Sequence, residues 1–149
     1  MFFSLGFLLA ANPSWTAEWG FRGLLPRGAG YYDKSSIRTI DDPLRQVWTV
    51  TVYNEKGKAD AWAFLKKQDK AAGNPNVLNQ ESTLLEFDCA KDQYRIVSIN
   101  IYDEKDVLLF SSSIIHTNWQ NILPGSINEK LKNEVCRSGD PSANNIKIP

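Results

Sequence analysis

The chain has 149 residues, which is the usual size of one domain and is long enough to bury a hydrophobic core. Seventeen Lys and Arg residues balance seventeen Asp and Glu residues, so the formal net charge is zero. Because no global field would attract nucleic acid or an anionic membrane, we expect no nucleic-acid partner. The five Trp, five Tyr and seven Phe favour half-buried strands over a helical bundle.

The N-terminal segment is typical of an export signal. Residues 2–11, FFSLGFLLAA, form an uncharged apolar run that is too short to span a bilayer, and small residues suited to cleavage follow. No Lys or Arg precedes this run, so a buried first strand of a cytosolic protein is the alternative interpretation. We expect a signal peptide over 1–17, a domain over 18–137 and a flexible tail over 138–149. No cysteine ends the apolar run, so we expect no lipid anchor.

Short alternating segments between turn signals predict an antiparallel sheet. The predicted strand segments are 28–40, which a polar turn at 33–36 interrupts, 46–53, 82–89, 93–102 and 107–115. Because short connections join consecutive segments, we expect a meander of about six strands. In the second segment, Trp48, Val50 and Val52 alternate with Thr49 and Thr51, which predicts a half-buried strand with the first three on its apolar face.

The pattern changes to that of a helix at PGSINEKLKNEVC, residues 124–136. Ser126 and Glu129 have the spacing of a capping box, in which the two side chains satisfy free backbone donors at a helix start. Ile127, Leu131 and Val135 then recur on one side of the helix and form an apolar stripe. We therefore predict a C-terminal helix that packs against the sheet.

The chain has two cysteines, and each possible role needs different partners. Two cysteines and the single His116 cannot supply four ligands of a structural zinc site without carboxylates, so we predict no metal site. Nothing in the sequence places His116 beside either cysteine. A Cys-His nucleophile pair is therefore a weak alternative, and we predict no catalytic residue and no cofactor. The interpretation that remains is a disulfide between Cys89 and Cys136, which would stabilise the domain outside the cytoplasm.

Four segments carry a resemblance to a known family. They are YYDKSSIR, VWTVTVY, LLEFDCAKDQYRI and WQNILPGSINEKLKNEVC. Over the range 19–136 their order and spacing resemble those of the surface-adhesin E family of small bacterial envelope proteins. The resemblance implies an α+β fold, in which the helix is tethered to one face of a single antiparallel sheet by the Cys89–Cys136 disulfide. It also implies a non-enzymatic adhesin that binds host extracellular-matrix and serum proteins.

Residues 54–80 look longer than the usual connection in that family. Helix formers dominate 59–72, and Gly73 is a stop signal. One interpretation is a small helix that covers a sheet edge or completes the core. The other is a presented protein-binding element. Its apolar anchors would be Trp62 and Phe64, and its basic rim would be Lys66, Lys67 and Lys70.

The sequence therefore favours an exported, non-enzymatic binding domain in the periplasm, in the medium or on the cell surface. Its leading function is adhesin-like binding of a protein partner, such as a host matrix or serum protein. The alternative is a periplasmic structural or accessory protein without a host-binding role. A third hypothesis is a small-molecule binder that uses the space between sheet and helix. An unpaired sheet edge would also allow a homodimer.

Overall fold

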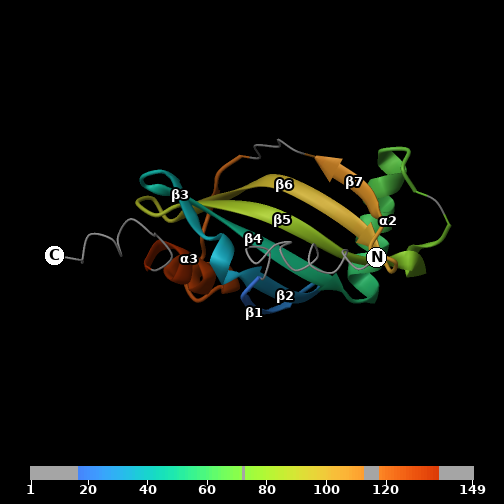
Figure 1. Cartoon of the computed structure of the whole chain (residues 1–149), viewed down its shortest axis with the longest axis horizontal. Helices are drawn as coiled ribbons and strands as arrows, with labels where there is room; N and C mark the ends of the chain where they lie inside the picture. The colour runs from blue at the N-terminus through green and yellow to red at the C-terminus, as the bar shows by residue number, and fades with distance from the viewer. Residues whose placement is uncertain (1–16, 72, 113–117, 138–149) are drawn as a thin grey trace, which may run out of the picture.

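The computed structural model describes residues 17–71, 73–112 and 118–137. Residues 1–16 of the expected signal peptide and the expected tail at 138–149 lie outside the described residues. Within the described part, eight strands form one antiparallel sheet, and two α-helices pack on it (Figure 1). The strands are β1 (Trp19–Leu25), β2 (Gly28–Asp33), β3 (Arg38–Asp41), β4 (Leu44–Tyr53), β5 (Leu78–Asp88), β6 (Gln93–Asp103), β7 (Leu108–Ser112) and β8 (Gln120–Asn121). The helices are α2 (Glu55–Lys67) and α3 (Ile127–Arg137), and two 3-10 turns lie at Lys34–Ser36 and Pro75–Val77.

The sheet is a meander. The strand order is β1-β2-β4-β5-β6-β7, and every neighbouring pair is antiparallel. Two short strands extend it, because β3 pairs with β4 and β8 pairs with β6. The expected α+β fold with a meander of about six strands is thus confirmed. No predicted segment covers β1 or β8, whereas β3 continues the predicted segment 28–40 after its polar turn.

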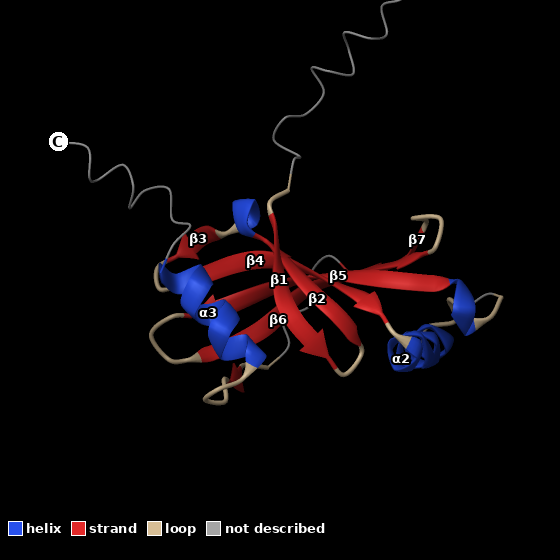
Figure 2. Cartoon of the chain, turned by 90° about the horizontal axis from the view of Figure 1, so that it is seen from below, coloured by secondary structure: helices blue, strands red, loops and turns tan. Residues whose placement is uncertain are grey.

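Both helices pack on the same face of the sheet, at opposite ends (Figure 2). We call it the helix face. At one end lies the α3 cluster, whose buried members are Tyr32, Ile37, Val47, Leu85, Phe87, Leu131 and Val135. At the other end lies the α2 cluster, whose buried members are Tyr53, Ala61, Leu65, Leu78 and Ile101. The core is therefore divided in two along the strands.

The predicted orientation of β4 is wrong. Val47 and Tyr53 lie in the two clusters, so the alternation of the strand places Thr49 and Thr51 on the helix face with them. Trp48, Val50 and Val52 therefore lie on the opposite face, where Val52 is exposed. The reason is that the two threonines lie in the gap between the helices, where an apolar residue would have no helix to pack against. Leu85 and Phe87, by contrast, occupy the predicted face of β5.

Helix α2 begins four residues before the predicted start and ends earlier. The Asn54 side chain accepts a hydrogen bond from the Gly57 amide at 2.8 Å, which caps the helix start. Gly57 is buried here, because α2 passes close to the Arg27 carbonyl and the Tyr53 ring. After Lys67 the chain leaves the helix, and Asp69 has a left-handed φ of 56°. A glycine near a helix start weakens the sequence signal, which explains the late prediction.

Helix α3 begins at the predicted cap. The Ser126 hydroxyl accepts a hydrogen bond from the Glu129 amide at 3.2 Å, and the Glu129 carboxylate accepts one from the Gly125 amide at 2.7 Å. The carboxylate thus reaches one residue further back than in a standard capping box. Leu131 and Val135 are buried, as the apolar stripe predicts.

We predict that Gly57→Ala destabilises the domain, although alanine has the higher helix propensity. The added Cβ would lie 2.8 Å from the Tyr53 ring and closer still to the Arg27 carbonyl, so backbone must move. Overpacking of this kind costs about 1–3 kcal/mol. The free energy of unfolding in urea measures the effect. Ala59→Gly, at an exposed position of the same helix, is the control for propensity alone. A stabilised Gly57→Ala variant would contradict the close approach.

Candidate functional site

A disulfide joins the end of β5 to the last turn of α3. Cys89 and Cys136 are bonded, their Cα atoms are 5.8 Å apart, and 47 positions separate them in the sequence. The predicted pairing is confirmed. Cys89 directly follows the strand that carries Leu85 and Phe87, so the bond holds α3 over the face that those two residues line.

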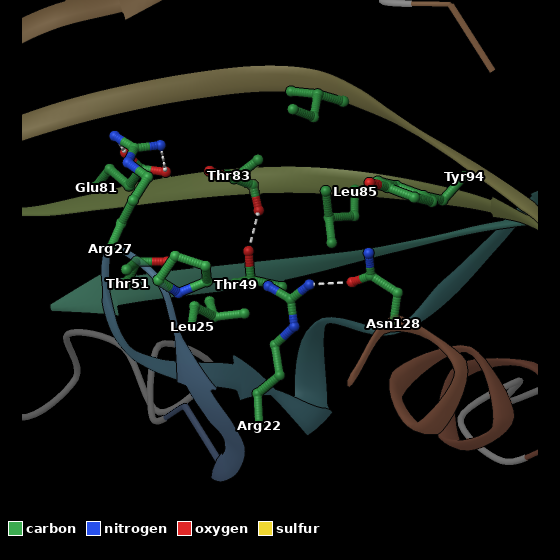
Figure 3. A pocket seen from close by; sticks show the side chains of 12 residues that line it. Arg22, Leu25, Arg27, Thr49, Thr51, Glu81, Thr83, Leu85, Tyr94 and Asn128 are labelled. Atoms are coloured by element: carbon green, nitrogen blue, oxygen red, sulfur yellow. Dashed lines mark hydrogen bonds and ion pairs between the residues drawn. The ribbon is translucent and has the colours of Figure 1, made fainter. Parts of the chain in front are cut away.

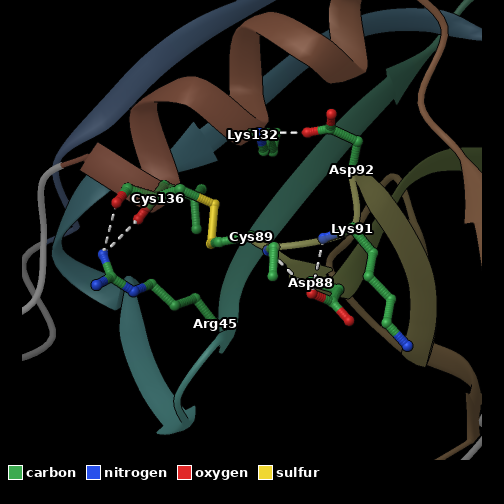
Figure 4. The surroundings of a disulfide bond; sticks show 9 residues. Arg45, Asp88, Cys89, Lys91, Asp92, Lys132 and Cys136 are labelled. Atoms are coloured by element: carbon green, nitrogen blue, oxygen red, sulfur yellow. Dashed lines mark hydrogen bonds and ion pairs between the residues drawn. A yellow bond between two sulfur atoms is a disulfide. The ribbon is translucent and has the colours of Figure 1, made fainter.

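Two polar side chains, Arg45 and Lys132, support the same junction (Figure 4). The Arg45 guanidinium on β4 donates to the Val135 and Cys136 carbonyl oxygens at 3.2 and 3.0 Å. These carbonyls belong to the C-terminal turn, where a cation also complements the helix dipole. Lys132 forms an ion pair with Asp92 at 2.5 Å, in the turn after β5. Covalent and polar contacts thus fix α3 at one end of the sheet.

The candidate binding residues of α2 have mixed environments. Trp62 packs partly against the α2 cluster, and the Phe64 ring contacts Phe110 edge-on with centroids 5.0 Å apart. Phe64 still exposes 36% of its surface. The three lysines of the predicted rim, Lys66, Lys67 and Lys70, are exposed. The helix therefore covers part of the core, as the first interpretation expects, and its role in binding stays a prediction.

A second apolar surface lies on β1 at one edge of the sheet. Trp19, Phe21 and Leu24 expose 53%, 64% and 76% of their surfaces. The strand register places Phe21 beside Tyr31 and Leu24 beside Ala29, and those partners lie beside Val50 and Val52 of β4. All of these positions are on the face opposite the helices. We call Trp19, Phe21, Leu24 and Tyr31 the β1 patch.

The β1 patch borders a shallow groove. The Phe21 and Tyr31 rings contact each other with centroids 5.6 Å apart. A groove of about 430 Å³ lies next to them and is lined by Trp19, Tyr31, Val50, Val52 and Gln80. Sequence reasoning missed this surface because it predicted no strand over β1 and placed Val50 and Val52 on the apolar face of a half-buried strand. The spacing of the aromatics in WGF and YY was the available signal.

A cavity of about 240 Å³ lies on the helix face between the two clusters (Figure 3). Its polar lining comes from several elements: Arg22 of β1, Arg27 of the β1–β2 turn, Thr49 and Thr51 of β4, Glu81 and Thr83 of β5, and Asn128 of α3. Leu25, Pro26, Leu85, Tyr94 and Ile96 supply the less polar walls. We call it the interhelix pocket.

One carboxylate of the interhelix pocket is fully engaged. Glu81 forms an ion pair with Arg27 at 2.7 Å and accepts a hydrogen bond from the Tyr53 hydroxyl at 2.8 Å. The Arg27 guanidinium also lies over the Tyr53 ring, 5.6 Å from its centroid. Burial raises the pKa of Tyr53 well above its ordinary value, and the Glu81 charge and hydrogen bond raise it further. Glu81 is thus satisfied by protein groups.

The described residues offer no recognisable metal centre or membrane span. Within 17–71, 73–112 and 118–137, no group of three or more His, Cys, Asp and Glu side chains could hold a metal ion. In the same ranges, no helix combines the length and the apolar character that crossing a bilayer requires. His116 lies outside the described residues.

The fold and the disulfide define a small α+β domain with a helix fastened to one face of a meander sheet. The family model described as surface-adhesin protein E matches residues 26–137. The chain therefore belongs to the surface-adhesin protein E family, as the four sequence segments predicted. No curated protein and no solved structure matches it. Membership indicates an adhesin-like, non-enzymatic protein that is exported or displayed at the cell surface, with protein or host partners in general.

We predict that Cys89→Ala and Cys136→Ala lower the free energy of unfolding by similar amounts. Either change removes the same crosslink, and the chain-entropy model gives about 4 kcal/mol for a separation of 47 residues. Urea denaturation of the oxidised protein measures both. The double variant is the control and should match the single variants. A large difference between the two singles would show that one cysteine has a separate packing role.

We predict that Tyr53→Phe costs about 1.5–3 kcal/mol at neutral pH, because it removes a hydrogen bond to a charged group. The raised pKa of Tyr53 in the folded state means that the neutral phenol stabilises the fold fully below the ordinary pKa of 10.0. This contribution decreases as pH rises above 10.0, so the wild type loses stability there and the gap to the variant narrows. Urea denaturation on both sides of pH 10.0 measures the gap. Tyr31→Phe, on the opposite face, is the control, and a constant Tyr53→Phe gap would contradict the prediction.

Proposed function

We propose that this domain binds a protein partner outside the cytoplasm and that the β1 patch is the binding surface. The partner class is host extracellular-matrix or serum protein, in keeping with the family. The observation that carries the proposal is the exposure of Trp19, Phe21 and Leu24 along one edge strand. Scattered exposed apolar residues are ordinary, but adjacent aromatic residues on one surface are typical of interfaces.

The environment of the β1 patch suits a peptide or protein rather than a small ligand. Its groove is open and shallow, and its aromatic side chains can act as anchors that become buried on binding. Among the described strands, β1 ends the strand order on this side, so its outer edge also offers backbone groups to a partner strand. The bulge between Phe21 and Gly23 twists this edge, which limits indiscriminate strand pairing.

Helix α2 is the second candidate surface. Its basic rim of Lys66, Lys67 and Lys70 is exposed beside the partly exposed Phe64. The Phe64 ring, however, already contacts Phe110, and Trp62 packs partly against the α2 cluster. Truncating either aromatic would therefore disturb the core as well as a binding surface. The exposed lysines allow a cleaner test of this helix.

We predict that the oxidised, exported protein binds at least one component of a panel of purified matrix proteins and serum. Phe21→Ser combined with Leu24→Ser should weaken binding at least about tenfold, since removal of interface anchors commonly costs more than 1.4 kcal/mol. Biolayer interferometry measures the dissociation constants. Lys66→Glu with Lys67→Glu and Lys70→Glu is the matched surface variant and should bind within about threefold of the wild type, since rim charges contribute little affinity.

The outcomes separate the candidate functions. Loss of binding only in the lysine variant would move the site to α2. Absence of binding to every panel component, together with protection from added protease in intact cells, would support the periplasmic accessory function instead.

A homodimer through the sheet edge is a further prediction. Light scattering should then show a dimer that the β1 variant, Phe21→Ser with Leu24→Ser, converts to a monomer.

A further inference from the structure

The interhelix pocket contains a cation without a counter-charge. Arg22 extends from β1 into the cavity, and its guanidinium donates to the Asn128 side-chain oxygen of α3 (Figure 3). Within the described ranges, Arg22 forms no salt bridge, and its buried Nε has no hydrogen-bond partner. Glu81 is the carboxylate in the lining of the same pocket, and it is already paired with Arg27 and Tyr53. The pocket therefore keeps one uncompensated positive charge.

The backbone of β1 explains why Arg22 occupies this position. Phe21 pairs with Tyr31 and Gly23 pairs with Gly30, so Arg22 is the extra residue of a bulge. A bulge redirects a side chain without ending the strand. Phe21 and Leu24 consequently face away from the helices, while Arg22 enters the pocket from its rim. Without the bulge, the Arg22 guanidinium could have remained in water.

Burial of an unpaired guanidinium is unfavourable. It removes water from a charge and leaves a donor unsatisfied, and the asparagine oxygen compensates only part of this. The same burial lowers the pKa of Arg22 below its ordinary value. A bound anion would restore both the counter-charge and the missing acceptor. Arginine suits this role because its planar fork binds a carboxylate through two parallel hydrogen bonds.

Additional donors face the same space. Thr49, Thr51 and Thr83 line the pocket, and the Thr49 hydroxyl donates to the Thr83 carbonyl at 3.0 Å. Among the described residues, the Thr51 and Thr83 hydroxyls have no hydrogen-bond partner. They remain able to donate to an anion beside Arg22. Apart from the mutually paired Arg27 and Glu81, the pocket thus combines one cation, Arg22, with neutral donors, which is the arrangement expected for a monoanion.

The size and walls of the pocket restrict the ligand further. A volume of about 240 Å³ corresponds to about eight water molecules at ~30 Å³ each, below the range of drug-sized sites. Leu25, Leu85 and Ile96 offer apolar contact to a short carbon chain. Phosphate would carry more negative charge than the single free cation balances and has no apolar part. The charge and the walls together favour a carboxylate.

We propose that the interhelix pocket binds a small monocarboxylate, with the carboxylate on Arg22 and the pocket threonines and its apolar body against Leu25, Leu85 and Ile96. This site is separate from the β1 patch, which lies on the other face of the sheet, so the proposal stands independently of the adhesin function. It makes the domain a binder of a free short-chain acid.

The test is a titration of the full oxidised protein with sodium butanoate, followed by amide NMR spectra. The amides of Thr49, Thr51, Thr83 and Asn128 should shift together and saturate. Butanamide, the neutral analogue of the same shape, should bind at least about tenfold more weakly. Sodium chloride at equal ionic strength should leave these amides unchanged. Absence of saturable shifts at these residues, or equal binding of butanamide, would overturn the proposal, and tighter binding of inorganic phosphate would overturn the carboxylate assignment.

Variants of Arg22 test whether its positive charge binds butanoate. Arg22→Gln should abolish saturable butanoate binding, and Arg22→Lys should weaken it, because an ammonium cannot form the paired hydrogen bonds. Arg38→Gln, an exposed change of the same charge on β3, should bind like the wild type. Unchanged binding in Arg22→Gln would overturn the role of Arg22. If that variant fails to fold, the wild-type shift pattern and the butanamide comparison still decide the proposal.

Discussion

The Cys89–Cys136 disulfide is the constraint on which the arrangement of this domain depends, because the helix that it holds has few other attachments. α3 fully buries only Leu131 and Val135, each of which contributes about 1.5–3 kcal/mol. Such a short helix would dissociate readily from an open sheet. The disulfide keeps its C-terminal turn on the end of β5, and Arg45 satisfies the last carbonyls from β4. The position of α3 in turn completes the α3 cluster and brings Asn128 to the interhelix pocket.

A long sheet with two short helices on one face leaves its middle without a helix. The strands β5 and β6 have eleven residues each, and their apolar positions are buried at the two ends by different helices. Between them lie Thr49, Thr51 and Thr83 with the paired Arg27 and Glu81. This polar middle separates two small cores and leaves the partly buried Arg22 accessible to a ligand.

The two faces of the sheet therefore suggest different kinds of recognition. The face opposite the helices carries adjacent exposed aromatic and aliphatic side chains at the β1 edge, which suits a macromolecular partner. The helix face carries a smaller, partly open cavity with a cation and several hydroxyl groups in its lining, which suits a small anion. β1 contributes to both, because its bulge directs Phe21 to one face and Arg22 to the other. A single irregular strand thus connects the adhesin-like surface with the pocket.

The sequence alone determined the strand segments from β2 to β7, the α3 cap at Ser126 and the pairing of the two cysteines, because these depend on local periodicity and on counting. It predicted no strand over β1. It could not determine which face of β4 is buried. Alternation separates Thr49 and Thr51 from Val50 and Val52, but only the docking of α2 and α3 decides which set is covered. The start of α2 depended on Gly57 fitting against the β1–β2 turn, and the pocket depended on a bulge that sends Arg22 toward Asn128. Those features come from contacts between residues far apart in the chain, so only the tertiary structure decides them.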